Sequence, residues 1–188
     1  LEYAVKGLWF PLASSFLVGA ADKGGLGFTA VQKGQLIAIP FAIGALMSPF
    51  VGQLCDRRFA TEKTLGVMLI ATGILKIVTA HQTTFSAWLV LASLFAILYV
   101  PTVSLTNSLA MSHLRVAKSE FPRVRVWGTV GWIAVAWIFS WIWLQHDLQF
   151  QWLPPFLKGE DYPDSYARMI DALTVAGVVC IGYGIFCW

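Results

Sequence analysis

Long apolar segments separated by short polar ones make up most of the sequence. Three of these segments contain no charged residue, namely Gln35–Leu54, Phe85–Met111 and Val126–Gln145. The hydrocarbon core of a bilayer is about 30 Å thick, and an α-helix needs about 20 apolar residues to cross it. Each of the three segments reaches that length, so each predicts a transmembrane helix.

Three further segments complete the pattern. Thr64–Ala80 contains one lysine, Lys76, near its end, while Gly7–Ala21 and Ala172–Trp188 are somewhat shorter. Together the six segments predict an all-α, polytopic membrane protein with six transmembrane helices. Because the first and last helices run into the ends of the sequence, we expect residues 1–188 to be one six-helix domain from a longer protein.

The distribution of lysine and arginine predicts how the helices are oriented, because cytoplasmic loops carry an excess of these residues. Asp56–Lys63 and Arg115–Arg125 hold more of them than the loops on the opposite side. We therefore expect both chain ends to be cytoplasmic. The longest loop, Gln149–Arg168, is expected outside, with a short interfacial helix near Phe150–Phe156. Lys76 then lies near the outer face, and we expect its amine to extend to the interface.

The composition excludes several other classes of protein. Hydrophobic residues make up 57% of the 188 residues and charged residues 12%, against roughly 45–50% and about 25% in soluble domains. The net charge of +3 is scattered between apolar segments, which argues against a nucleic-acid partner. The sequence shows no catalytic motif and no metal-ligand spacing of histidine or cysteine. We therefore expect neither an enzyme nor a metal or cofactor site.

The end of the second helix carries a candidate gate formed by Gly52, Asp56 and Arg57. Gly52 and Asp56 are four residues apart and share a helix face. A glycine there would let a neighbouring helix approach closely, and the carboxylate could pair with that neighbour in one state of the gate. The alternative is an ordinary cytoplasmic loop with a solvated aspartate.

The fourth helix contains a run of polar side chains around Pro101, from Tyr99 to Ser108. Proline frees a backbone carbonyl one turn earlier, and polar residues inside a membrane tend to face the interior of a helix bundle. The run therefore either lines a cavity, with Asn107 as a candidate solute contact, or bonds to neighbouring helices and holds them together.

The fifth helix opens with side chains that suit a flat polar solute. Arg125, Thr129 and Trp132 are spaced i, i+4, i+7 and share one face. They supply a fork of donors, a hydroxyl and a flat stacking surface. Gly128 and Gly131, on another face, would permit close packing. Because Arg125 lies toward the cytoplasmic side, the alternative is that it only extends to the interface.

Lys6 places a charge in the first helix, inside the hydrocarbon or near its inner edge. It can pair with an acidic residue, line a cavity or extend to the interface, and the sequence leaves these alternatives open. The charge-free helices contain no aspartate or glutamate at mid-depth. The sequence therefore identifies no proton-carrying residue.

Three of these segments resemble a known transporter family. Gly52-x-x-x-Asp56-Arg57 is similar to the signature between helices two and three of the major facilitator superfamily. The segments Tyr99–Ser108 and Phe121–Trp132 resemble the fourth and fifth helices of the bacterial nucleoside:proton symporters of that superfamily.

The resemblance implies the amino-terminal six-helix half-bundle of a twelve-helix transporter that works by alternating access. It implies that Arg125, Thr129 and Trp132 face the solute path, and that proton-carrying acids lie in the missing carboxyl-terminal half. The implied function is proton-coupled uptake of nucleosides across the cell inner membrane. Its partners would be a nucleoside, protons and the lipid bilayer. Two alternatives remain: a superfamily member that carries sugars or another small polar solute, and a non-transporting membrane sensor or enzyme on the same fold.

Overall fold

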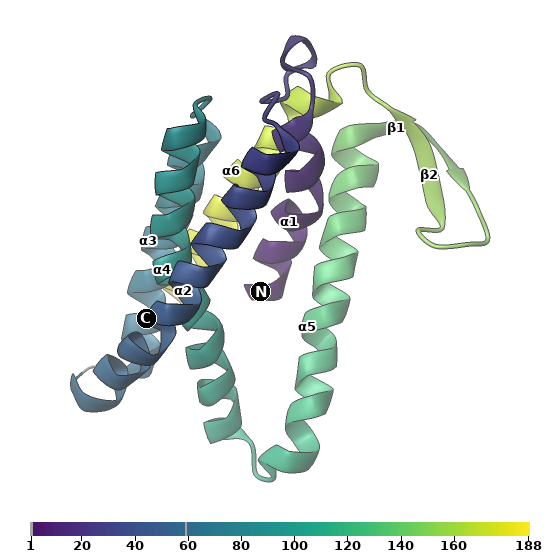
Figure 1. Cartoon of the computed structure of the whole chain (residues 1–188). Coiled ribbons are helices and arrows are strands. Elements are labelled where there is room, and N and C mark those ends of the chain that lie inside the picture. Colours follow the sequence, from purple (N-terminus) through teal and green to yellow (C-terminus); the bar gives the residue numbers. More distant parts are fainter. Residues whose placement is uncertain (1, 59) are drawn as a thin grey trace.

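A computed structural model of the chain describes residues 2–58 and 60–188, without the side chains of residues 54–58 and 117. Six α-helices make up most of the described residues (Figure 1). They are α1 (Glu2–Val18), α2 (Ala30–Arg58), α3 (Thr61–Ala80), α4 (Phe85–His113), α5 (Ala117–Phe139) and α6 (Ser165–Phe186). The all-α prediction is confirmed.

Five of the described helices, α2 to α6, are long and apolar enough to cross a membrane. The chain is therefore a multi-pass membrane protein. α1 has 17 residues, which correspond to about 26 Å of helix at 1.5 Å per residue. Because that is slightly less than the thickness of the hydrocarbon core, a sixth spanning helix stays a prediction.

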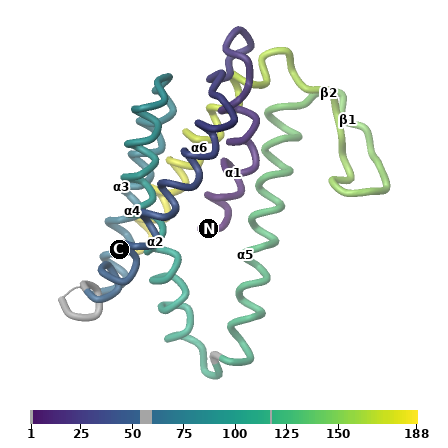
Figure 2. Tube along the Cα trace, viewed as in Figure 1, coloured from purple at the N-terminus to yellow at the C-terminus, as the bar shows by residue number. Residues whose placement is uncertain are grey.

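The helices pack mostly against partners that are distant in sequence. α3 packs along α6, α2 along α4, and α1 against both α5 and α6. The α1–α2 and α3–α4 connections lie at one end of the bundle, and the α4–α5 connection and the start of α3 lie at the other (Figure 2). The two basic segments therefore share one end, as their sequence pattern predicts. That this end faces the cytoplasm stays a prediction.

α3 and α6 approach each other most closely at two pairs of glycines. A Cβ added to Gly73 would lie 2.6 Å from the carbonyl oxygen of Gly177, and one added to Gly66 would lie 2.8 Å from that of Gly184. A side chain fits at neither place without a shift of backbone. Small residues at such contacts let membrane helices pack backbone to backbone. The two pairs thus form a seam that fixes α3 against α6.

The connection between α5 and α6 is a β-hairpin, so the predicted interfacial helix near Phe150–Phe156 is wrong. A π-helical turn, η2 (Ser140–Leu144), follows α5, and β1 (Gln145–Phe150) pairs antiparallel with β2 (Leu157–Asp161). Two adjacent prolines lie in the turn between the strands. Because proline has no amide hydrogen to donate, this segment favours a turn over a helix.

α5 and α6 both begin earlier than predicted. α5 begins at Ala117 and not at Val126, and Pro122 lies inside it. α6 begins at Ser165 and not near Ala172, because its polar first turns contact η2 and are not part of the apolar run. The apolar pattern marks the part of a helix inside the membrane and misses such polar extensions.

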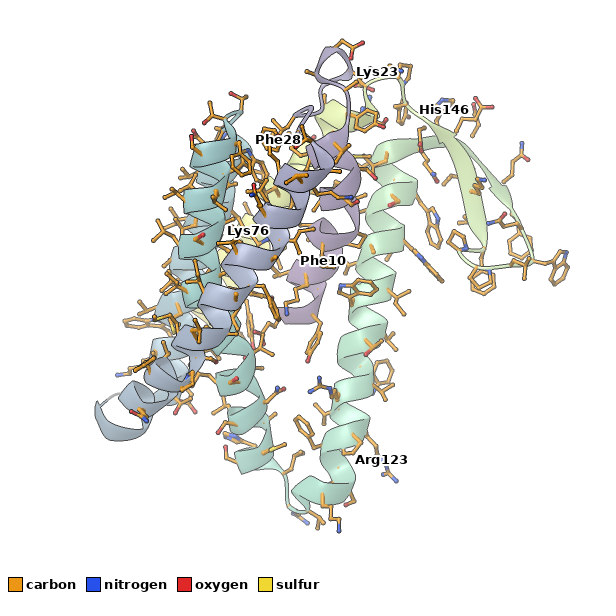
Figure 3. The ribbon with its side chains drawn as sticks, viewed as in Figure 1. Phe10, Lys23, Phe28, Lys76, Arg123 and His146 are labelled. Atoms are coloured by element: carbon orange, nitrogen blue, oxygen red, sulfur yellow. The ribbon has the colours of Figure 1, made fainter. Side chains whose placement is uncertain are left out.

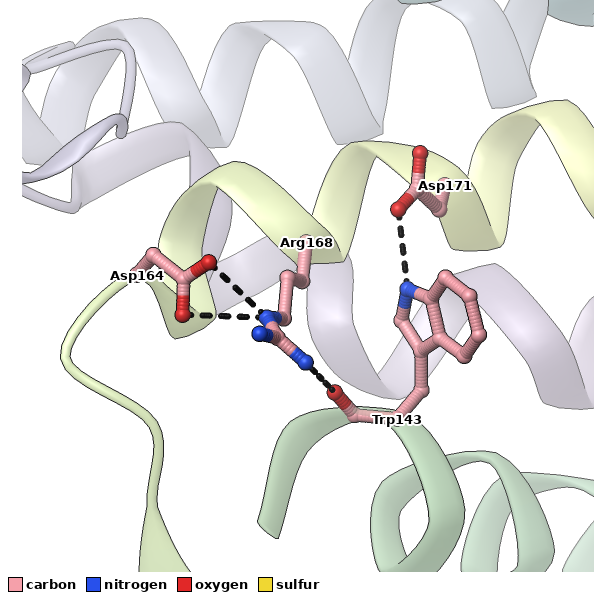
Figure 4. Close-up of polar contacts among 4 residues, drawn as sticks. All are labelled: Trp143, Asp164, Arg168 and Asp171. Carbon is pink, nitrogen blue, oxygen red and sulfur yellow. Dashed lines mark hydrogen bonds and ion pairs between the residues drawn. The ribbon is translucent and has the colours of Figure 1, made fainter.

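Polar contacts tie η2 to the start of α6 (Figure 4). The Arg168 guanidinium donates to both carboxylate oxygens of Asp164 at 2.9 Å and to the carbonyl oxygen of Trp143 at 3.4 Å. The Trp143 indole in turn donates to the Asp171 carboxylate at 2.8 Å. The hydrogen bond from Arg168 lowers the pKa of Asp164, so this carboxylate stays charged and bonded at neutral pH.

Candidate functional site

A cavity of about 660 Å³ lies between α1, α2, α4 and α5, with one residue of α3 in its wall. Small-molecule sites usually occupy roughly 300–1,000 Å³, so this cavity has the size of a ligand site. Much of its wall is aromatic: Tyr3, Trp9, Phe10, Phe41, Trp88, Phe95, Tyr99 and Trp132. Figure 3 shows Phe10 in the space between α2 and α5. The polar groups on the wall are few, which is typical of sites that bind a flat, partly polar ligand.

Two glycines bring α1 and α5 together beside this cavity. Gly7 of α1 lies directly against the backbone of Trp132 in α5. Gly128 of α5 lies against the ring of Tyr3, which would come within 2.9 Å of a Cβ added to the glycine. The close packing predicted for Gly128 is confirmed. No described atom lies within 4 Å of a Cβ added to Gly131, so that glycine has no such role in the described part of the chain.

The structure separates the four predicted solute contacts into two groups. Thr129 and Trp132 lie on the cavity wall. Arg125 is exposed and lies outside the wall. It precedes Thr129 by four residues on α5, which is about 6 Å along the helix axis at 1.5 Å per residue. Asn107 on α4 is half-buried and also lies outside the wall. Solute contact by any of the four stays a prediction.

The polar run in α4 has both of the roles that the sequence leaves open. Tyr99 lies on the cavity wall, so one end of the run faces the cavity. Thr102 is fully buried, and its hydroxyl contacts the Glu2 carboxylate of α1 at 2.8 Å and the Tyr99 carbonyl oxygen at 2.6 Å. The Tyr99 hydroxyl donates to the backbone carbonyl oxygen of Glu2 at 3.0 Å. These bonds hold α1 against the middle of α4.

Glu2 is a buried acid that the sequence predictions do not include. Only 4% of its surface is exposed, and it lies beside Tyr99 and Thr102, halfway along α4. Its Oε1 accepts the bond from Thr102, and the buried Thr106 hydroxyl of α4 lies beside the same carboxylate without a direct hydrogen bond to Oε2. In the sequence Glu2 precedes the apolar part of α1, so it looks like a residue at the membrane edge. Its burial depends on α4, which the pattern of α1 cannot indicate.

Two lysines approach one pair of stacked aromatic rings in the cavity. The Nζ atom of Lys76 lies 4.7 Å from the ring centroid of Phe95, and that of Lys6 lies 5.4 Å from the ring centroid of Tyr99. The two rings stack with their centroids 4.9 Å apart. Cations are attracted to the faces of aromatic rings at these distances.

The prediction that Lys76 extends to the interface is wrong, because the side chain is 6% exposed and lines the cavity. Both α4 and α6 pack against α3, the helix that carries Lys76. Among the alternatives for Lys6, cavity lining is confirmed.

The predicted gate residues are only partly described. No described atom lies within 4 Å of a Cβ added to Gly52, so no described helix packs against this glycine. The side chains of Asp56 and Arg57 lie outside the described residues. The gate at the end of α2 therefore stays a prediction.

Comparisons with known proteins agree on one family. Residues 1–154 match the model of the family described as nucleoside H+ symporter. Over 135 residues the chain is 37% identical to YegT of Escherichia coli (strain K12), a protein provisionally named a nucleoside transporter. That match covers 71% of this chain and 30% of YegT.

Two further relatives come from the same organism. The chain is 28% identical over 148 residues to the xanthosine permease and 24% identical over 144 residues to the nucleoside permease NupG. Each match covers 74% of this chain and 33% of the relative. The chain therefore spans about a third of the length of the curated relatives it matches. No solved structure gives a significant match. Since the family model covers most of its length, the chain belongs to the nucleoside H+ symporter family.

Proposed function

We propose that the chain is the amino-terminal half of a transporter that takes up nucleosides together with protons across the cell inner membrane by alternating access. Membership of the nucleoside H+ symporter family supports this function. In this proposal a carboxyl-terminal half of the same protein forms the opposite wall of the solute path, and the lipid bilayer surrounds both halves.

The observation that carries the proposal is the aromatic cavity with Trp132 and Thr129 on its wall. A nucleoside combines a flat base with a hydroxylated sugar. The Trp132 indole offers the base a stacking surface, and the Thr129 hydroxyl offers a hydrogen bond to the sugar or the base. Arg125 and Asn107 lie outside the cavity, and we propose that they contact the solute in another state of the cycle.

Proton coupling requires a group that alternates between a protonated and a charged form, and we assign this role in the present half to Glu2. It is the one buried carboxyl group among the described residues. A carboxylate oxygen without a hydrogen-bond partner is costly to bury, so binding of a proton at Oε2 would relieve that cost. The acids expected in the second half would complete the proton path.

Uptake of radiolabelled uridine and adenosine tests the function. Cells that lack their own nucleoside transport should accumulate both compounds when they express the full-length protein, and a protonophore should abolish the accumulation. Competition by unlabelled sugars with none by nucleosides would contradict the proposal and favour a sugar transporter. The 188-residue chain alone should show no saturable uptake, because it would supply one wall of the path.

A further inference from the structure

The charge on the cavity wall is entirely positive in the described part of the chain. Its charged side chains are Lys6 and Lys76, and no described carboxylate lies on the wall. Neither lysine forms an ion pair with a described acidic residue. The amines approach the Phe95 and Tyr99 rings of a single stack, so the two charges are directed at the same part of the cavity.

Glu2 does not neutralise this charge by direct contact. It lies one helical turn before Lys6 on α1, but its Oε1 is bonded to Thr102 of α4 and its side chain lies outside the cavity wall. No ion pair joins this acid to either lysine among the described residues. The positive charge stays available to a molecule inside the cavity.

A buried ammonium is costly unless it is paired. The aromatic stack offsets part of that cost for Lys76 and Lys6, but an aromatic face carries no full negative charge. Two ammonium groups at one stack also repel each other. A negatively charged group in the cavity would pair with both amines and offset their repulsion.

We propose that the cavity binds an anionic solute, namely a nucleoside-like molecule with a carboxylate or another acidic group on its base or sugar. The acidic group would lie beside Lys6 and Lys76, and the flat ring would extend along the aromatic wall toward Trp132. This inference rests on the proposed nucleoside transport and names the class of nucleoside that the site prefers.

Matched pairs of solutes test the inference in the full-length protein. Uridine is compared with orotidine, which adds a carboxylate to the base, and with uridine-5′-carboxylic acid, which carries one on the sugar. The wild-type protein should take up at least one of the two acids about tenfold better than uridine, because hydrogen bonds to a charged group are stronger than neutral ones. Lys76→Met should lower the ratio of acid to uridine uptake, and Lys76→Arg should restore most of it.

Two more variants keep the test decisive. Lys6→Met should also lower the ratio of acid to uridine uptake, and it serves as the test if Lys76→Met fails to fold. Lys23 is an exposed lysine in the α1–α2 connection, so Lys23→Met should leave the ratio unchanged. Uptake of uridine with rejection of both acids would overturn the inference and leave the proposed function intact. A preference for an acid that survives in both Lys6→Met and Lys76→Met would overturn it as well. Failure to take up uridine and both acids would overturn the proposed function itself.

Discussion

Gly73 on α3 and Gly177 on α6 face each other so closely that a Cβ on either residue would meet the carbonyl oxygen of the other, at 2.6 Å and 2.8 Å respectively. Gly73→Ala should therefore force the helices apart. Overpacking of this kind costs about 1–3 kcal/mol, so the detergent-solubilised full-length protein should unfold at a lower temperature.

Gly182→Ala is the matched control for this seam. Gly182 is also on α6, and no described atom lies within 4 Å of a Cβ added there. Alanine favours the helix over glycine by up to about 1 kcal/mol, so this variant should be no less stable than the wild type. Equal stability of Gly73→Ala and Gly182→Ala would show that the α3–α6 contact is looser than described.

Replacement of Glu2 tests its assignment as a proton carrier. Glu2→Gln keeps the acceptor for the Thr102 hydroxyl but cannot exchange a proton. Nucleoside exchange without a pH gradient should persist, whereas accumulation driven by a pH gradient should be lost. Both are measured as uptake into proteoliposomes. Glu160→Gln, an exposed acid on β2, should behave as the wild type. Normal gradient-driven accumulation by Glu2→Gln would exclude the assignment.

Arg125→Lys distinguishes a solute contact from a residue that only extends to the interface. Lysine keeps the charge but lacks the planar fork of donors. A binding site that loses a hydrogen-bond partner is weakened by about 1–3 kcal/mol, so solute affinity should fall by about tenfold or more at normal expression. Lysine reaches the interface as well as arginine does. Unchanged affinity would therefore leave Arg125 with a role in topology alone.

Cysteine labelling tests the orientation of the bundle. Single cysteines at Lys118 and Glu160 are introduced into a protein whose native cysteines are replaced by alanine. A membrane-impermeant maleimide added to intact cells should label position 160, on the hairpin, and not position 118, at the start of α5. The reverse pattern would invert the orientation that the basic segments predict.

The spanning helices could be predicted from the sequence because apolar length is a local property. Gln35–Leu54 and Phe85–Met111 fall inside α2 and α4 as observed. The environment of a charged residue is set by other helices and could not be predicted in this way. The Lys76 amine is drawn to Phe95 on α4, and Glu2 is buried by Tyr99 and Thr102 of the same helix.

The glycine contacts between α3 and α6 have a signal in the sequence, which is the spacing of the glycines. Gly66 and Gly73 are seven residues apart on α3, and Gly177 and Gly184 are seven apart on α6. Seven residues make about two helical turns, so each pair lies on one face. Equal spacing on two apolar helices lets both glycine pairs meet at once, and in the structure they meet in antiparallel order, Gly66 with Gly184 and Gly73 with Gly177. Which two helices meet cannot be read from the spacing alone, because other glycines, such as Gly52 and Gly131, face open space among the described residues.

Tyr99 connects the cavity to the buried acid through a single side chain. The Lys6 amine lies over its ring, and its hydroxyl donates a hydrogen bond to the backbone carbonyl oxygen of Glu2. A shift of α4 at this residue would alter both contacts in one movement. Solute binding in the cavity and the protonation of Glu2 would then change together. Since linkage between binding sites is reciprocal, a proton that changes the affinity for solute must have its own affinity changed by the solute to the same degree.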